Sequence, residues 1–252
     1  MTITRKALEQ YINTYLRAHE FKDYTSNGLQ VEGKDNIKTL VTGVTASQAL
    51  IEQAIEHQAD ALLVHHGYFW KNETQEIIGM KQKRIKALLL HDINLLAYHL
   101  PLDAHDVVGN NRQLAQKLEI HEAQVVPGVA HQLLWRGQLK TPLTAQEFAL
   151  HIERCLQRPP LCIEAGQHLI QEIAWCTGGA QDYIDTAAQI GVDAFLSGEA
   201  SERTFHSAIE QNIHYFGAGH HATERYGVEA LGAHLQEQFD IKWHHIDIDN
   251  PV

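Results

Sequence analysis

The chain has 252 residues, of which 44% are hydrophobic and 20% charged, an ordinary balance for a globular protein of one large domain or two compact lobes. Its formal net charge of −11 argues against broad electrostatic binding to nucleic acid. No apolar run approaches the roughly 20 residues of a membrane span. Residues 1–20 lack the apolar segment of a signal peptide, so we expect a cytoplasmic protein.

The first half of the chain alternates segments of helical and strand-like periodicity. A helix is predicted over residues 4–19, and a polar turn follows at Asn27–Gly28. Further on, strands are predicted at 39–44, 61–64 and 93–98, and helices at 47–57, 81–91 and 112–118. This alternation predicts βα units around a largely parallel sheet.

The middle of the chain changes character. Residues 123–140 resemble two antiparallel hairpin strands that are punctuated by Gly and Pro. We therefore place a boundary near residue 122, which gives an N-terminal α/β lobe over 1–122 and a C-terminal α/β lobe over 123–252. The cysteines Cys155, Cys162 and Cys176 are odd in number and lack a C-x-x-C spacing, so we expect reduced thiols rather than disulfides or structural zinc.

The second half repeats the βα rhythm of the first. Aligning Gly43 with Gly178 and Asp60 with Asp193 needs a gap of two residues and places His66 where Glu199 stands. Two βαβ units can also resemble each other by chance. The repeat predicts an α/β fold of two similar lobes, each with a mixed, largely parallel sheet. Because ligands bind beyond the carboxyl ends of such strands, we expect a site in the cleft between the lobes.

The grouping of the 18 histidines is more informative than their number. His65 and His66 follow the strand predicted at 61–64 and directly precede Gly67. Successive strand residues point to opposite faces, so the pair can share a cavity only if the backbone turns here. For an isolated pair of histidines, a purely structural role is the alternative.

A second cluster follows the strand predicted at 93–98. Pro101 fixes the backbone of the loop, and Asp103 offers a hard oxygen ligand that complements imidazole. His99 and His105 are close by in the sequence. Either could orient a ligand or transfer a proton, or could fill a hydrogen-bonded structural position.

A third cluster follows the strand predicted at 213–216. His220 and Glu224 are at i and i+4, so they share one face of the helix that begins there. They form a suitable chelating pair, in which Glu224 could bridge two ions, although an ordinary surface pair fits equally well. His221 points in a different direction.

One further histidine pair serves as a comparison. His244 and His245 lie within the strand predicted at 241–248, where alternation sends the two side chains to opposite faces. We therefore assign this pair to structure. Two adjacent histidines alone therefore do not indicate a metal site. The candidate ligands are distinguished by their position at a strand end beside carboxylates.

The three clusters predict a two-metal site with His65, His66, Asp103, His220 and Glu224 as ligands. Imidazole combined with carboxylate suits Zn, Fe, Mn, Co or Ni. Two such ions can lower the pKa of a bound water to about 7 and hold both the attacking and the leaving oxygen, which suits an anionic substrate such as a phosphate. His99 or His221 could then act catalytically by carrying a proton.

Five motifs occur in order along almost the whole chain: Asn27-Gly-Leu-Gln-Val, Val64-His-His-Gly, His99-Leu-Pro-Leu-Asp, Ser197-Gly-Glu and Gly219-His-His-Ala-Thr-Glu. Together they resemble the GTP cyclohydrolase 1 type 2 family, also called Nif-three-like proteins, and most closely its bacterial YbgI branch. The resemblance implies a dinuclear metal site between two similar α/β lobes in a toroidal homohexamer, with Glu224 touching both metals. Many relatives have Thr-Asn in place of Leu100-Pro101 and an aspartate in place of Glu199, which affects substrate contacts rather than metal ligands.

Two functions are compatible with these residues. The leading hypothesis is a metal-dependent hydrolase that attacks a phosphoester or a purine ring carbon of a nucleotide or a related phosphorylated or heterocyclic substrate. The alternative is a non-catalytic hexamer that binds or delivers metal or recruits a partner. An enzyme needs an open coordination position and a proton-transfer group beside the metals, whereas a carrier needs neither.

Overall fold

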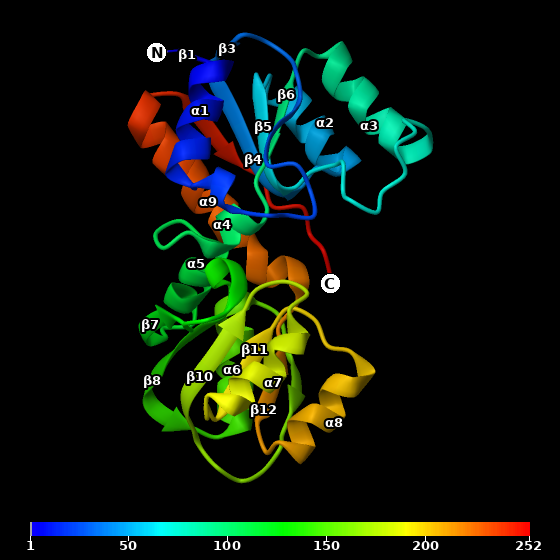
Figure 1. Cartoon of the computed structure of the whole chain (residues 1–252). Coiled ribbons are helices and arrows are strands. Elements are labelled where there is room, and N and C mark those ends of the chain that lie inside the picture. Colours follow the sequence, from blue (N-terminus) through cyan, green and yellow to red (C-terminus); the bar gives the residue numbers. More distant parts are fainter. Residues whose placement is uncertain (1) are drawn as a thin grey trace. The chain divides into compact units, whose positions relative to one another are not determined.

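The computed structural model describes residues 2–252, which divide into two compact units (Figure 1). The first unit comprises the chain up to Gly109 together with Gly227–Asp249, and the second comprises Asn110–Tyr226 and Asn250–Val252. The chain thus changes unit earlier than residue 122, the boundary predicted from the sequence, and later returns to the first unit. Packing explains the difference, because Leu114 and Leu118 are buried in the core of the second unit.

The first unit contains a five-stranded sheet. Its order is β13 (Lys242–His245), β4 (Thr39–Thr45), β5 (Ala61–His66), β6 (Asn94–Ala97) and β2 (Gly28–Val31). The pairings from β13 to β6 are parallel, and β2 runs antiparallel to β6. The short strands β1 (Ile3–Thr4) and β3 (Asn36–Ile37) form a separate antiparallel pair.

Helices cover both faces of this sheet (Figure 1). One face packs against α1 (Arg5–Tyr15) and the later turns of α9 (His220–Phe239). The other packs against α2 (Gln48–Glu56) and α3 (Gly79–Leu90). A 3-10 turn (Ala18–Glu20) follows α1, and the short helix α4 (Leu100–Ala104) follows β6.

The helix beginnings follow from local sequence. The Thr4 side chain accepts a hydrogen bond from the Ala7 N–H, and Ser47 accepts one from Leu50 at the start of α2. The helix predicted over residues 4–19 corresponds to α1, whose apolar side chains Leu8 and Ile12 are fully buried. None of the helices in residues 2–252 is long and apolar enough to cross a bilayer.

The second unit contains a six-stranded sheet. Its order is β7 (His121–Val125), β8 (Trp135–Leu143), β10 (Ile170–Cys176), β11 (Ala194–Ser197), β12 (His214–Gly217) and β9 (Leu161–Ile163). The pairings β10–β11 and β11–β12 are parallel and the others antiparallel. The predicted hairpin corresponds to β7 and β8, with β7 lying a few residues earlier than expected.

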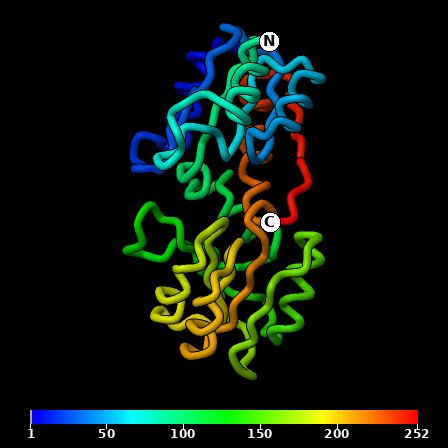
Figure 2. The backbone as a smooth tube through the Cα atoms, turned by 90° about the vertical axis from the view of Figure 1, so that its right-hand side faces the viewer, coloured from blue at the N-terminus to red at the C-terminus, as the bar shows by residue number. Residues whose placement is uncertain are grey.

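The helices of the second unit also lie on both faces of its sheet. One core includes side chains of α5 (Asn110–Lys117) and α6 (Ala145–Leu156), and the other includes side chains of α7 (Ile184–Gln189) and α8 (Glu202–Glu210). Short 3-10 turns cover Ala130–Gln132 and Gln181–Tyr183. Figure 2 shows the chain passing from the orange strand β12 almost directly into α9.

Two aspartates mark equivalent positions in the two sheets. Asp60 Oδ2 accepts hydrogen bonds from Lys38 N at 2.9 Å and Thr39 N at 3.0 Å, which lead into β4. Asp193 Oδ2 accepts two bonds of 2.8 Å from the Gln171 and Glu172 N–H groups, in the first residues of β10. Each carboxylate thus fixes the start of its parallel strand pair in the same way.

The strand register corrects one detail of the predicted repeat. Leu40 pairs with Ala61 in the first unit, and Ile173 pairs with Ala194 in the second. These pairs align without the predicted two-residue gap, so Gly43 corresponds to Cys176 rather than to Gly178. His66 still corresponds to Glu199.

Candidate metal centre

His65 and His66 are the last residues of β5, which extends two residues beyond the predicted strand. Their ring centroids nevertheless lie 4.5 Å apart. The Nδ1 atom of His65 lies 2.9 Å from the Tyr98 carbonyl, and Nδ1 of His66 lies 3.1 Å from Thr45 Oγ1. Because a carbonyl only accepts, Nδ1 of His65 carries the hydrogen and Nε2 keeps its lone pair for a ligand.

The segment after β6 contributes His99, which directly precedes α4, and Asp103, which lies within α4. Asp103 is 5% exposed, and its Oδ1 lies 3.4 Å from His65 Nε2. Potential ligand atoms of His65, His66 and His99 all lie within 4.8 Å of one another. The first unit therefore gathers three imidazoles and one buried carboxylate, a donor set that could bind a metal ion.

Asp23 is a further participant that the sequence did not reveal. Its side chain is 2% exposed, and its Oδ1 lies 2.7 Å from His99 Nδ1. Burial raises the pKa of Asp23, but hydrogen bonds from His99, Asn27 and the Tyr24 N–H outweigh this effect and lower it. Asp23 is therefore a carboxylate at neutral pH and orients the His99 ring. The only sequence signal was its proximity to the Asn27–Gly28 turn.

Trp70 also borders the histidines of the first unit. Its half-buried indole ring lies 5.0 Å from the His99 ring at 82° and 5.9 Å from the His66 ring. The indole N–H donates to the Gly67 carbonyl at 3.2 Å, which holds the ring in this position. The sequence analysis did not select this aromatic side chain.

In the second unit, His220 lies between two carboxylates. Its Nε2 is 3.0 Å from Glu224 Oε2, and its Nδ1 is 2.6 Å from Glu199 Oε1. Burial lowers the pKa of His220, but Glu224 and Glu199 outweigh it and raise the pKa to about 9. The predicted i,i+4 pair thus forms at the start of α9, and Glu199, at the position equivalent to His66, orients it.

Gly178 provides the space for Glu224. Its φ of +68° favours glycine, and a Cβ atom there would lie 2.0 Å from Glu224 Oε1 and 3.2 Å from His220 Nε2. The Gly178 N–H also donates to Thr223 Oγ1 at 3.0 Å. The loop after β10 therefore approaches α9 so closely that no side chain fits between them.

The remaining histidines of the predicted clusters have other positions. His221 is buried, and its backbone N–H donates to the Val252 carbonyl oxygen. His105 contacts the Tyr15 carbonyl through Nε2 and accepts the Val107 and Val108 N–H groups at Nδ1, which is a structural arrangement.

The comparison pair behaves as strand alternation predicts. The His244 ring lies 4.4 Å from the His57 ring, whereas His245 Nδ1 lies 3.0 Å from Thr42 Oγ1. The two imidazoles thus contact different elements of the first unit. Neither belongs to a group of potential ligands among the described residues.

Buried imidazole and carboxylate groups at the carboxyl ends of parallel strands define a mixed α/β protein capable of binding metal. The family model Duf34/NIF3 (NGG1p interacting factor 3) matches residues 3–251, and the chain belongs to this family. It is 57% identical to a "GTP cyclohydrolase 1 type 2 homolog" of Pasteurella multocida over 97% of this chain and 98% of the relative. The counterpart of that name in Escherichia coli K12 is 53% identical, over 97% of this chain and 98% of its own.

Solved structures show the same fold. The protein ybgI, described as of unknown function, is 50% identical and superimposes with a TM-score of 0.94 over 99% of this chain and 100% of its own. Reduced HcgD from Methanocaldococcus jannaschii, at 23% identity, has a TM-score of 0.85 over 98% of this chain and 99% of its own. At 23% identity, the similarity to HcgD shows a shared fold and nothing more.

Proposed function

We propose that the chain is a dinuclear metal-dependent hydrolase that acts on a nucleotide or a related phosphorylated or heterocyclic substrate. The proposed ligands are His65, His66 and Asp103 of the first unit and His220 and Glu224 of the second. Neither set alone offers enough donors for two ions, each of which needs about four ligands. The proposal therefore requires both sets to serve one centre.

The donor chemistry supports this assignment. Imidazole and carboxylate groups suit Zn, Fe, Mn, Co or Ni. Metal ions bound by such groups supply Lewis acidity and a nucleophile at neutral pH. The chain's own residues fix the ligands: the Tyr98 carbonyl and Thr45 hold the histidines of β5, and Glu199 holds His220. Such outer contacts commonly determine tautomer and ring orientation.

The pair formed by Asp23 and His99 is the observation that favours an enzyme over a carrier. A hydrolase needs a group that moves a proton beside the reacting atoms, and a carrier has no such need. Asp23 holds Nδ1 of His99 and so orients the His99 ring, whose centroid lies 5.2 Å from that of His65 and 5.9 Å from that of His66. We assign His99 as the proton carrier and keep His221 as the second candidate for that role.

The test is turnover by metal-loaded protein on a panel of nucleotides, with GTP first because the curated relatives carry its name. We expect turnover by the wild type and none by a folded Asp103→Ala variant, with His244→Ala as the matched control that keeps full activity. Equal turnover by wild type and Asp103→Ala would assign the activity to another site or to a contaminant.

A further inference from the structure

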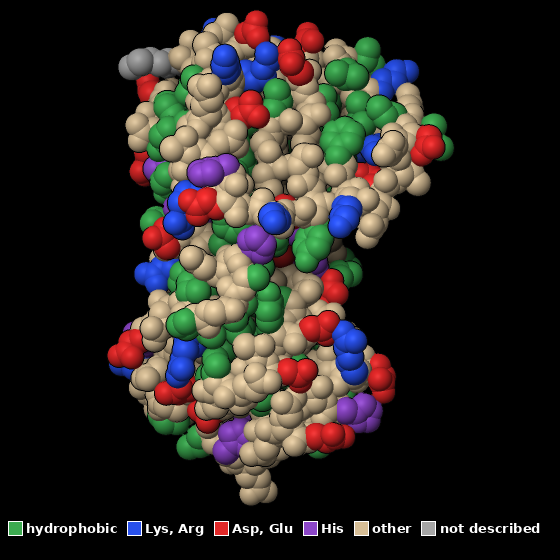
Figure 3. Space-filling view, in the orientation of Figure 1, with side chains coloured by type: hydrophobic (Ala, Val, Ile, Leu, Met, Phe, Trp, Pro, Cys, Tyr) green, Lys and Arg blue, Asp and Glu red, His purple; other side chains and the backbone are tan. Residues whose placement is uncertain are grey.

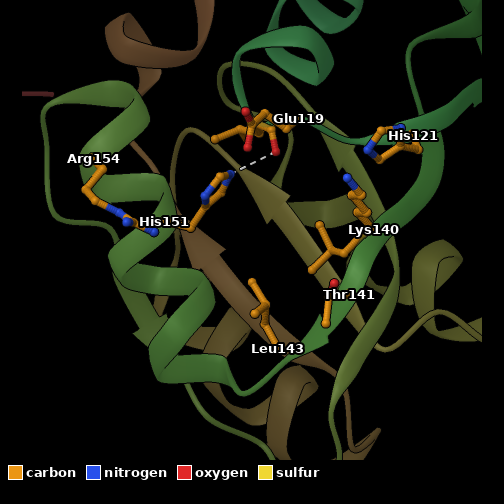
Figure 4. Close-up of a pocket in the computed structure, with 9 residues that line it drawn as sticks. Glu119, His121, Lys140, Thr141, Leu143, His151 and Arg154 are labelled. Carbon is orange, nitrogen blue, oxygen red and sulfur yellow. Dashed lines mark hydrogen bonds between the residues drawn. The ribbon is translucent and has the colours of Figure 1, made fainter.

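The second unit contains a cavity of about 610 Å³ in addition to the candidate ligands (Figure 4). It lies between helix α6, the hairpin β7–β8 and the segment that follows α5. Its lining includes the apolar side chains of Leu118, Leu139 and Leu143 and the charged side chains of Glu119, Lys140 and Arg154. A cavity of this size falls within the range of about 300–1,000 Å³ that is typical of small-molecule sites.

The cavity is remote from His220 and Glu224 along the sheet. Leu143, in its wall, pairs with Ile170, the first residue of β10. Glu199 and His220, in contrast, follow the last residues of β11 and β12. Because β10, β11 and β12 are parallel, the cavity and the candidate ligands lie at opposite ends of the sheet.

The charge of the lining is opposite to that of the chain. The sequence has 31 acidic and 20 basic residues, and acidic side chains are spread across the face seen in Figure 3. At the cavity, however, Lys140, Arg154, His121 and His151 face a single carboxylate, Glu119. Among residues 2–252, the side chains of Lys140, Arg154 and His121 form neither hydrogen bonds nor ion pairs. The charges of Lys140 and Arg154 are therefore available to a ligand.

Both strands of the hairpin depart from regular pairing at the cavity wall. Residues 139–142 of β8 lie opposite the single residue Gln171, whose side chain donates to the Leu139 carbonyl. The pairing of β7 with β8 shifts directly after His121, where Glu122 has a φ of +53°. Bulges of this kind redirect side chains and are frequent beside functional sites. Here they turn Lys140 and Thr141 toward the space that His151 enters from α6 (Figure 4).

We propose that this cavity binds a small organic phosphate. Arg and Lys are the side chains that recognise phosphate most strongly, Arg through paired N–H donors. Part of the lining is apolar, with Leu118 fully buried and Leu139 5% exposed, and this part receives the organic portion of the ligand. His151 is fixed in the lining through Nε2, which lies 2.9 Å from the Leu118 carbonyl oxygen.

Calorimetric titration of the full-length, metal-loaded protein with phenyl phosphate and with inorganic phosphate tests the proposal. We expect phenyl phosphate to bind more tightly than inorganic phosphate, and the double variant Lys140→Ala/Arg154→Ala to bind it at least about tenfold more weakly. The control Lys83→Ala/Lys86→Ala removes the same charge from the exposed side of α3 and should bind as the wild type does. All four side chains are exposed, so the variants should fold.

The Glu224→Ala variant separates this site from the proposed metal centre. This variant should bind phenyl phosphate as tightly as the wild type does, through Lys140 and Arg154, even if it loses its hydrolytic activity. Absence of phenyl phosphate binding in the wild type, or equal affinity in the Lys140→Ala/Arg154→Ala variant, would overturn the proposal. Equal affinity for phenyl phosphate and inorganic phosphate would overturn the assignment of an organic ligand.

Discussion

The Nδ1 atom of His99 lies 2.7 Å from Oδ1 of Asp23, although 76 residues separate the two in the sequence. The same carboxylate accepts the Leu100 N–H at 3.0 Å, and the nearby Asn27 accepts the His99 N–H at 2.7 Å. The loop after α1 thus holds both the backbone and the ring of His99. This loop therefore positions His99 at the end of β6 and does more than connect elements.

Replacement of Asp23 by Asn should slow turnover about 10–100-fold, the usual cost of losing such an outer contact. An amide can still accept from His99 Nδ1 but carries no negative charge. The metal content should change little, because His99 is not among the proposed ligands. Comparison of kcat with metal content in the same preparation tests this. A variant with normal kcat would contradict the role of His99 as the proton carrier.

A methyl group at position 178 should displace Glu224. The Cβ of Gly178→Ala would lie 2.0 Å from Glu224 Oε1, at a positive φ that already disfavours alanine. We expect metal affinity to fall at least about tenfold. Gly191→Ala is the matched control, since Gly191 also has a positive φ, +76°, but open space around its Cβ. Equal metal affinity in the two variants would show that the close approach to Glu224 is unimportant.

The sequence predicted the βα rhythm and the candidate ligands because both depend on local patterns. Alternating periodicity located most strands and helices within a few residues, and strand ends located His65, Asp103 and His220. The chain's return to the first unit was not predictable, since it depends on where the later turns of α9 pack. Asp23 was missed for the same reason, because its role depends on a contact with His99 that no local pattern encodes.

The stability contribution of Asp60 should depend on pH. Burial raises its pKa, but hydrogen bonds from Lys34 and from the Lys38 and Thr39 N–H groups outweigh this and lower it. The folded pKa then lies below the unfolded one, so the contribution is present above about pH 4 and is lost as the pH falls through the folded pKa. Asp60→Asn should cost about 2 kcal/mol at neutral pH, and this cost should shrink in acid.

Urea unfolding of wild type and Asp60→Asn at about pH 7 and at a pH below about 3 measures this difference. Asp35→Asn is the control, because that carboxylate is 84% exposed and its ion pair with Arg5 should contribute little at either pH. A cost for Asp60→Asn that is the same at both pH values would contradict the pKa shift.

Metal content measured by elemental analysis tests the central claim most directly. Wild-type protein should hold about two transition-metal ions per chain, as a two-metal site requires. Glu224→Ala should lose most of this metal while keeping the circular dichroism spectrum of a folded protein, and His244→Ala should hold as much as the wild type. Unchanged metal content in folded Glu224→Ala would contradict the proposed dinuclear centre.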